Sequence, residues 1–237
     1  MTLPLLLLPG MMCDARLFGP QINALSPSRP VGVADLSLHD SIPAMAAHVL
    51  ANAPERFALA GLSMGGIVAM EVIKQAPDRV GKLALLDTNP CAEVDTVRAR
   101  RQPQIDKANA GRLFEVMRDE MKPNYLADGP KRQEVLDLCM EMAMDLGPAV
   151  FIRQSVALRD RPDYQDSLRA VQVPTLILCG RADKLCPVAR HTLMQSLIPG
   201  TTLTIIENAG HLPTLETPAQ TTAALRRWLE EDEITNG

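Results

Sequence analysis

Residues 61–66 read Gly-Leu-Ser-Met-Gly-Gly, and this stretch decides the fold. It follows a short apolar run at 56–60 and precedes a segment, 67–75, that is apolar on nearly every side. The run predicts a buried strand, and the segment predicts a helix packed against a sheet. Glycines two residues to either side of Ser63 remove the side chains that would collide across a sharp turn. We therefore predict that Ser63 projects from a strained strand-to-helix turn, beside a helix N-terminus that favours negative charge.

Short apolar runs bounded by Gly, Pro or Asp alternate with helical patterns through much of the chain. This alternation is typical of a parallel α/β sheet. Ser41 is expected to cap a helix over 41–52, and Thr-Pro-Ala-Gln at 217–220 matches a capping box at the start of the last helix. The expected strands are 4–8, 30–36, 56–60, 82–87, 175–179 and 202–207.

The span between Asp87 and Val173 contains no strand pattern. Because a structureless loop of that length is improbable in a compact domain, we predict a helical insertion over one edge of the sheet. We place this insertion at 91–170, within a single domain that covers 1–237. Its expected helices are 98–107, 111–121, 132–145 and 149–158.

The insertion is rich in apolar, adaptable side chains. One interpretation is that they line a pocket for a small hydrophobic acyl or alcohol group, and the other is that they fill the insertion's own core. The pocket candidates are Phe114, Met117, Met121, Tyr125, Met140, Met144 and Phe151.

Composition excludes several classes of protein. The chain has 237 residues, which suits one domain with a modest insertion. With 24 basic against 28 acidic residues and 3% aromatics, it lacks the basic surface and stacking platforms of a nucleic-acid binder. No window approaches the 18 apolar residues of a membrane span. Five scattered cysteines without CxxC spacing argue against a disulfide framework or a thiolate metal site and predict a reducing, cytoplasmic location.

A serine hydroxyl is inert at neutral pH unless a base takes its proton, so a histidine is needed. Among the four histidines, His39, His48 and His191 lie in a polar turn or in helical patterns and are expected to be surface or packing residues. His211 lies in the loop after the strand 202–207. Because loops at the carboxyl edge of a parallel sheet bind ligands, His211 is the expected base. The alternative is that Ser63 merely caps its helix.

The base must itself be oriented by an acid. Asp183 lies in the loop directly after the strand 175–179, and Asp87, which also ends a strand, is its rival. We favour Asp183 because one helix and one strand separate it from His211. The order Ser63, Asp183, His211 is the chain order expected of an α/β hydrolase.

A tetrahedral intermediate needs hydrogen-bond donors that are in place before it forms. The backbone N–H of Met64 is one candidate. The N–H of Met11, in the loop after the first strand, is the other, because Gly10 lets that backbone come close. The alternative for the methionines of this loop, Met12 above all, is that their side chains fill the core.

Four motifs occur in a fixed order: Leu-Pro-Gly-Met at 8–11, the turn at 61–66, Gly-Arg-Ala-Asp at 180–183, and Gly-His-Leu-Pro at 210–213 with Glu216 and Pro218 beyond. On these motifs the whole chain resembles the α/β-hydrolase superfamily, of the esterase, lactonase and C–C hydrolase type. The resemblance implies an α/β fold with a mostly parallel sheet, helices on both faces and an inserted helical cap.

Two departures from that family pattern matter. Members usually carry His-Gly where this chain has Pro9-Gly10, so the second oxyanion donor is less well defined than the Ser-His-Asp group. The chain also opens in what resembles the third strand of the fold, so we expect a sheet of about six strands.

The expected function is that of a serine hydrolase that cleaves a small carboxylic ester or lactone through an acyl-enzyme, without a metal or organic cofactor. C–C bond hydrolysis, thioester hydrolysis, perhydrolysis and acyl transfer use the same groups and stay open. A ligand-binding, receptor-like module is the non-enzymatic alternative. The expected partner is a small-molecule ester, and apolar surface on the insertion could serve either a homodimer or the pocket entrance.

Overall fold

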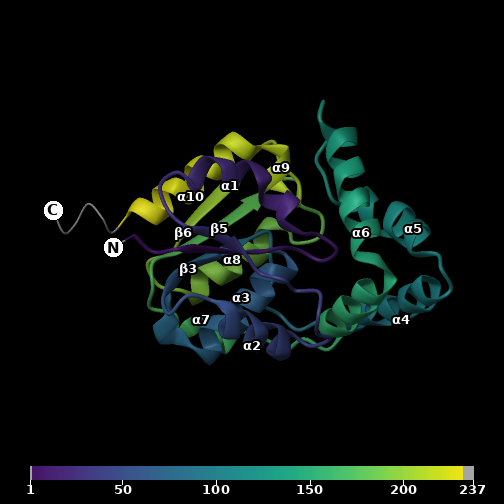
Figure 1. Cartoon of the computed structure of the whole chain (residues 1–237), viewed down its shortest axis with the longest axis horizontal. Coiled ribbons are helices and arrows are strands. Elements are labelled where there is room, and N and C mark those ends of the chain that lie inside the picture. Colours follow the sequence, from purple (N-terminus) through teal and green to yellow (C-terminus); the bar gives the residue numbers. More distant parts are fainter. Residues whose placement is uncertain (1, 232–237) are drawn as a thin grey trace.

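The computed structural model describes residues 2–231, and a sheet of six parallel strands forms its centre (Figure 1). The strand order is β2-β1-β3-β4-β5-β6. Each predicted strand is present, although the edge strand β2 is shorter than expected, and the predicted fold class, a parallel α/β sheet with helices on both faces and a helical insertion, is confirmed. The strands are β1 (Leu5–Leu8), β2 (Val31–Val33), β3 (Phe57–Leu62), β4 (Val80–Leu86), β5 (Thr175–Gly180) and β6 (Thr202–Ile206).

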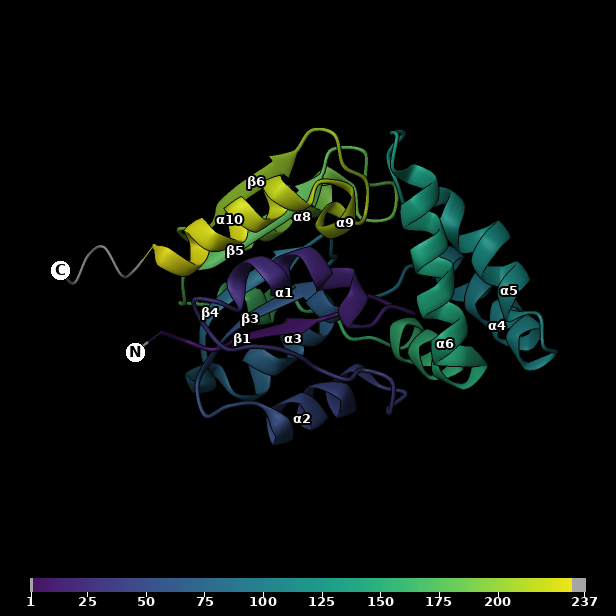
Figure 2. The same ribbon diagram turned by 45° about the horizontal axis from the view of Figure 1, so that its top comes forward.

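Helices cover both faces of the sheet (Figure 2). Alternate side chains of a strand point to opposite faces, so Leu59 of β3 packs in one core, whereas Ala58 and Ala60 pack in the other. Burial on both faces explains why the strands read as continuous apolar runs. One face carries α2 (Ile42–Asn52), α3 (Met64–Gln75), α7 (Gln165–Arg169) and α8 (Val188–Leu197); the other carries α1 (Gly19–Leu25) and α10 (Pro218–Glu230).

The helical insertion lies beyond the carboxyl ends of the strands, as Figures 1 and 2 both show. It contains α4 (Asp95–Asn109), α5 (Leu113–Glu115), a π-helical segment (Val116–Met121) and α6 (Arg132–Arg159). Two of the predicted helices are merged in α6, which bends at Gly147, where φ is 76°. No helix among residues 2–231, the long α6 included, combines the length and the apolar character that a bilayer crossing requires.

The two predicted helix caps had different outcomes. Ser41 Oγ accepts a hydrogen bond from Ala44 N at 3.4 Å, so the first prediction is confirmed. The capping box at 217–220 is wrong, because no side chain caps α10 there. Instead, Thr217 Oγ1 donates to the carbonyl of Pro213 at 3.2 Å. Pro213 belongs to the short helix α9 (Pro213–Glu216), which directly precedes α10, and its carbonyl also accepts the Thr217 N–H at 3.1 Å, so Thr217 is bonded back to α9 and not forward to α10.

Candidate active site

Ser63 lies in a strained turn between β3 and α3, with φ 55° and ψ −116°. A Cβ added to Gly61 would lie 2.3 Å from the carbonyl oxygen of Gly65, and one added to Gly65 would lie 2.0 Å from the carbonyl oxygen of Leu8. Only glycine fits at either position, as the sequence pattern predicted. Thr88 Oγ1 donates to the Ser63 carbonyl at 2.7 Å and helps to hold the turn.

Hydrogen bonds connect Ser63, His211 and Asp183. His211 Nε2 lies 2.9 Å from Ser63 Oγ, and His211 Nδ1 lies 2.8 Å from Asp183 Oδ2. The other carboxylate oxygen, Oδ1, accepts the N–H groups of Leu185 at 2.8 Å and Cys186 at 2.9 Å. Oδ2 faces the imidazole and accepts the hydrogen bond of Nδ1–H. This leaves Nε2 as an acceptor for the serine hydroxyl.

Asp87, the rival acid, ends β4 beside Asp183. Its Oδ1 accepts the Gly180 N–H at 2.9 Å, and its side chain has no solvent exposure. Burial and the neighbouring charge of Asp183 raise the pKa of Asp87 well above its usual range. At Asp183, burial opposes ionisation, but the facing His211 ring and the two amide donors outweigh it and lower the pKa. The pair therefore carries its negative charge on Asp183, the carboxylate that touches the imidazole.

The loop that carries His211 is held by a half-buried carboxylate, Glu216. Its oxygens accept the N–H groups of Gly210 and Leu212 at 2.9 Å each, and that of Ala127 at 2.8 Å. The His211 N–H donates to the carbonyl of Tyr125, in the insertion, at 2.7 Å. Sequence reasoning assigned no role to Glu216, although it belongs to one of the family motifs. The structure makes it the link between the histidine loop and the insertion.

Two backbone N–H groups beside Ser63 are free to face an oxyanion. Met64 is the first residue of α3 and so has no acceptor within the helix, and among residues 2–231 neither Met64 N nor Met11 N has a hydrogen-bond acceptor. A Cβ added to Gly10 would lie 3.5 Å from Ser63 Cβ, so the Met11 loop passes directly against the serine. Both predicted donors therefore lie next to the nucleophile candidate.

A buried glutamine from α6 anchors this loop. Gln154 Oε1 accepts the Met12 N–H at 2.8 Å, and Gln154 Nε2 donates to the Leu36 carbonyl at 3.2 Å. Met12 has a φ of 56°, a conformation that residues other than glycine rarely adopt, so the loop needs such support. Sequence analysis did not find Gln154, because its partners lie more than 100 residues away along the chain.

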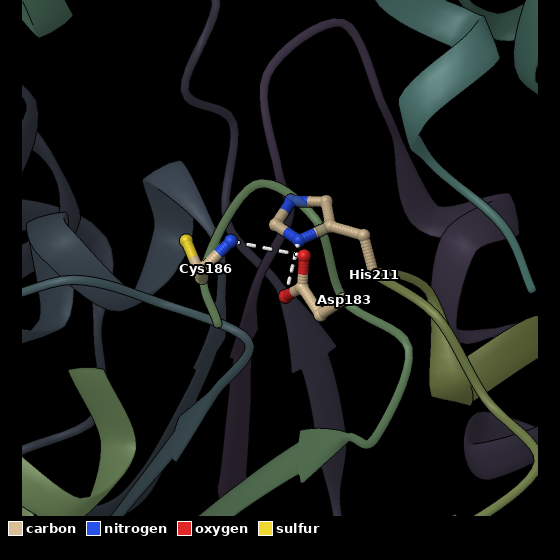
Figure 3. Close-up of side chains that lie close together, drawn as sticks. All are labelled: Asp183, Cys186 and His211. Carbon is tan, nitrogen blue, oxygen red and sulfur yellow. Dashed lines mark hydrogen bonds and ion pairs between the residues drawn. The ribbon is translucent and has the colours of Figure 1, made fainter. Parts of the chain in front are cut away.

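Asp183, Cys186 and His211 lie close enough together to suggest a metal site (Figure 3). The donor set fits one poorly. Asp183 already accepts three hydrogen bonds, and in Figure 3 the Cys186 sulfur points away from the carboxylate. Burial and the nearby carboxyl groups also raise the pKa of the Cys186 thiol well above its usual range, whereas a metal ligand must be a thiolate. The cluster is better explained as a network that orients His211.

A cavity of about 440 Å³ opens at Ser63 and His211, between the sheet and the insertion. Of the seven predicted pocket residues, Met121 and Tyr125 line it. The remaining five do not, which corrects the sequence expectation. Met117 and Phe151 are fully buried in the core, Met140 packs against that core, and Phe114 and Met144 are 49% and 36% exposed. Met117, Met140 and Phe151 therefore pack in a core that the insertion shares with one face of the sheet.

The other three histidines lie outside the cavity lining. His39 and His48 pack against each other, with ring centroids 5.3 Å apart. His191 is fully buried, and its Nε2 accepts the Thr88 N–H at 3.1 Å. The expectation of surface or packing roles agrees with these positions.

Burial lowers the pKa of His191 to about 4. The folded protein therefore keeps this ring neutral, whereas the unfolded chain takes up a proton once the pH falls below about 6.5. Stability should thus decline between pH 6.5 and 4 and level off below. The glutamine of His191→Gln cannot titrate. We therefore expect the unfolding free energy of this variant to fall by about 2 kcal/mol less than that of the wild type when the pH is lowered from 7 to 4.5. Urea unfolding at the two pH values measures this, and equal losses in both proteins would contradict it.

Comparison with known proteins gives the same fold. A family model described as "Alpha/beta hydrolase family" matches residues 5–225. A pimeloyl-acyl-carrier-protein methyl ester esterase of Legionella pneumophila is 24% identical, over 90% of this chain and 89% of its own. The esterase of the same name from Aliivibrio salmonicida is 26% identical, over 97% of this chain and 94% of its own.

Solved structures of other proteins superpose on this chain as well. A thermophilic esterase from Thermogutta terrifontis, solved with malate bound, superposes with a TM-score of 0.87 at 27% identity and covers 97% of this chain and 90% of its own. The enol-lactonase of Burkholderia xenovorans gives a TM-score of 0.85 at 20% identity, over 97% and 92%, and at that identity shows the fold alone.

Proposed function

The chain belongs to the alpha/beta hydrolase family, and we propose that it hydrolyses small carboxylic esters through Ser63, His211 and Asp183. The observation that carries this proposal is the pair of hydrogen bonds made by one imidazole: 2.9 Å from Nε2 to the serine hydroxyl, and 2.8 Å from Nδ1 to a buried carboxylate. The esterase activity named for its relatives supports the same reaction.

In this mechanism His211 Nε2 takes the proton of Ser63 as Oγ attacks the ester carbonyl carbon. The N–H groups of Met11 and Met64 bind the negative oxygen of the tetrahedral intermediate. As the C–O bond to the alcohol breaks, Nε2–H gives the proton to the leaving oxygen, and an acyl-serine remains. Water then attacks the acyl carbon with His211 again as the base, which releases the acid and restores the hydroxyl. Asp183 keeps the proton on Nδ1 and stabilises the imidazolium.

Covalent labelling tests the proposed nucleophile. A fluorophosphonate probe should modify the wild type once, and peptide mapping should find the adduct on Ser63. Activity on a chain-length series of 4-nitrophenyl esters should be highest for short acyl groups, because the cavity is small. An unlabelled Ser63 together with no ester turnover would overturn the proposal in favour of a binding module.

The same panel separates the reactions that share this machinery. Esters and a lactone are compared by kcat/KM with a thioester and with a vinylogous 1,5-diketone, whose cleavage breaks a C–C bond. Esters should be the best substrates. A preference of more than about ten-fold for the diketone would instead indicate C–C bond hydrolysis.

A further inference from the structure

The wall of the cavity is positively charged, although the whole chain has a formal net charge of −4. Four cationic side chains and two carboxylates line it. One of these carboxylates, Glu120, forms an ion pair at 2.6 Å with Lys107, which does not line the cavity. Glu120 therefore does little to neutralise the positive side chains of the cavity wall. The cationic residues are Arg100, Arg101, Arg161 and Lys184, and the carboxylates are Glu93 and Glu120.

The second carboxylate is shared by two arginines. Glu93 Oε2 lies 3.1 Å from Arg101 Nη2 and 3.1 Å from Arg161 Nη1. The side chains of Arg101, Glu93 and Arg161 are only 12%, 7% and 6% exposed. A single carboxylate thus faces two guanidinium groups in a poorly hydrated site, and within the described part of the chain one positive charge is left without a counter-charge. Burying such a charge is costly unless an anion joins it.

Arg101 is the arginine with spare hydrogen-bonding capacity. Its Nε is buried and has no acceptor among residues 2–231, whereas Arg161 Nε donates to the Cys91 carbonyl at 2.9 Å. Burial and the charge of Arg101 lower the pKa of Arg161, against the influence of Glu93, as expected where positive charge is in excess. The guanidinium plane is suited to a carboxylate, which it binds through two parallel hydrogen bonds.

This charge lies beside the reacting groups. Arg101 Nη1 is 3.6 Å from the sulfur of Met11, the residue whose N–H is a proposed oxyanion donor. Arg101 and Ser63 line the same cavity of about 440 Å³. The exposed Arg100 and Lys184 have no ion-pair partner among residues 2–231, so they add to the positive potential at the cavity. A substrate whose ester reaches Ser63 can therefore present a second group to Arg101.

We propose that the natural substrate is a small ester that carries a carboxylate, and that Arg101 binds this carboxylate with support from Arg161. This inference rests on the proposed ester hydrolysis. Since the carboxylate is bound away from the scissile bond, it stabilises the ground state and the transition state alike, and its loss should act mainly on KM.

The test compares an anionic ester with a neutral one of the same shape. Mono(4-nitrophenyl) adipate and the corresponding 4-nitrophenyl adipamate differ only in a terminal carboxylate or amide. We expect the wild type to prefer the adipate by about ten-fold or more in kcat/KM, as for a charge-assisted hydrogen bond. Arg101→Met should abolish most of this preference through a rise in KM. A second pair, 4-carboxyphenyl butyrate and 4-carbamoylphenyl butyrate, places the charge on the alcohol side, and a preference in either pair supports the proposal.

A matched control removes the same charge from the same helix. Arg98 lies on α4 outside the cavity lining, and Arg98→Met should leave the preference as in the wild type. Arg101→Met should fold, because it leaves Glu93 and Arg161 as a balanced pair. Equal turnover of anionic and neutral esters by the wild type, or a preference that survives both Arg101→Met and Arg161→Met, would overturn the carboxylate site while ester hydrolysis stands.

A binding measurement is independent of turnover. Calorimetry of Ser63→Ala with monomethyl adipate should show binding that is at least about ten-fold weaker in the Ser63→Ala, Arg101→Met double variant. If no ester is hydrolysed and Ser63 takes no label, the proposed reaction fails. A difference in binding between the two variants would still support the carboxylate site in that case, and equal binding would overturn the site.

Discussion

Replacement of Ser63 by alanine is expected to lower kcat for a short 4-nitrophenyl ester by about 10⁴-fold or more, with a smaller change in KM. The hydroxyl is the only group of the protein that forms a bond to the acyl carbon in the mechanism. The oxyanion donors, the histidine and the cavity all remain in the variant, so the residual rate measures what they achieve with water alone. Stopped-flow kinetics should show a burst of 4-nitrophenol in the wild type, if deacylation is slow, and none in the variant.

The fold should tolerate this change. Alanine can adopt the strained turn as serine does, because the hydrogen bond from Thr88 goes to the carbonyl of residue 63 and not to its side chain. Ser196→Ala on α8, which removes an exposed hydroxyl outside the cavity lining, is the matched control and should keep wild-type activity. Retention of more than about one hundredth of the wild-type kcat in a correctly melting Ser63→Ala protein would rule out the acyl-enzyme.

The fold and the central hydrogen-bonded group could be predicted because each depends on a local pattern. The turn at 61–66 needs glycine at two positions. Gly61 lies against the Gly65 carbonyl within the turn, whereas Gly65 lies against the Leu8 carbonyl at the end of β1. Asp183 and His211 each follow a strand, and the carboxyl ends of parallel strands meet at one edge of the sheet. Loop position and chain order were therefore enough to bring the three candidate side chains together.

The lining of the cavity could not be predicted in the same way. Which face of an insertion helix points to the cavity depends on its rotation, and irregular backbone changes that rotation. Val116–Met121 forms a π-helical segment, which shifts the direction of every side chain after it relative to a regular helix. Gly147 bends α6 between two candidate pocket residues, Met144 and Phe151. Helical spacing alone therefore misplaced most of the pocket residues.

Contacts between segments that are distant in the sequence could not be predicted for a different reason. Glu93 and Arg161 are 68 residues apart, and Met12 and Gln154 are 142 apart, so no sequence window contains both partners. Such contacts are a property of the folded chain. The Met12–Gln154 contact also attaches the insertion to the loop beside Ser63, whereas the Glu93–Arg161 pair joins the two ends of the insertion. The insertion is therefore part of the site's support as well as its cover.

Asp183→Asn is expected to lower kcat by about 10⁴-fold while leaving the fold intact. Asp183 Oδ1 accepts two backbone N–H groups, at 2.8 and 2.9 Å, so the amide oxygen of asparagine must take that position. The amide NH₂ then faces His211 Nδ1, which must become an acceptor. The imidazole proton moves to Nε2, and the ring can no longer take a proton from Ser63. Steady-state kinetics measures the loss, and nitrogen-15 spectra of the histidine ring should report the change of tautomer.

Asp87→Asn is the matched comparison, because Asp87 lies beside Asp183 and was its rival as the orienting acid. Its raised pKa favours the protonated form of Asp87, which asparagine imitates. The amide oxygen can accept the Gly180 N–H, and the NH₂ can face Asp183 as the proton of the acid form does. The expected loss is less than about ten-fold, against about 10⁴-fold at Asp183. The reverse ranking would mean that the negative charge belongs to Asp87, so that β4 and not β5 carries the acid that orients the histidine.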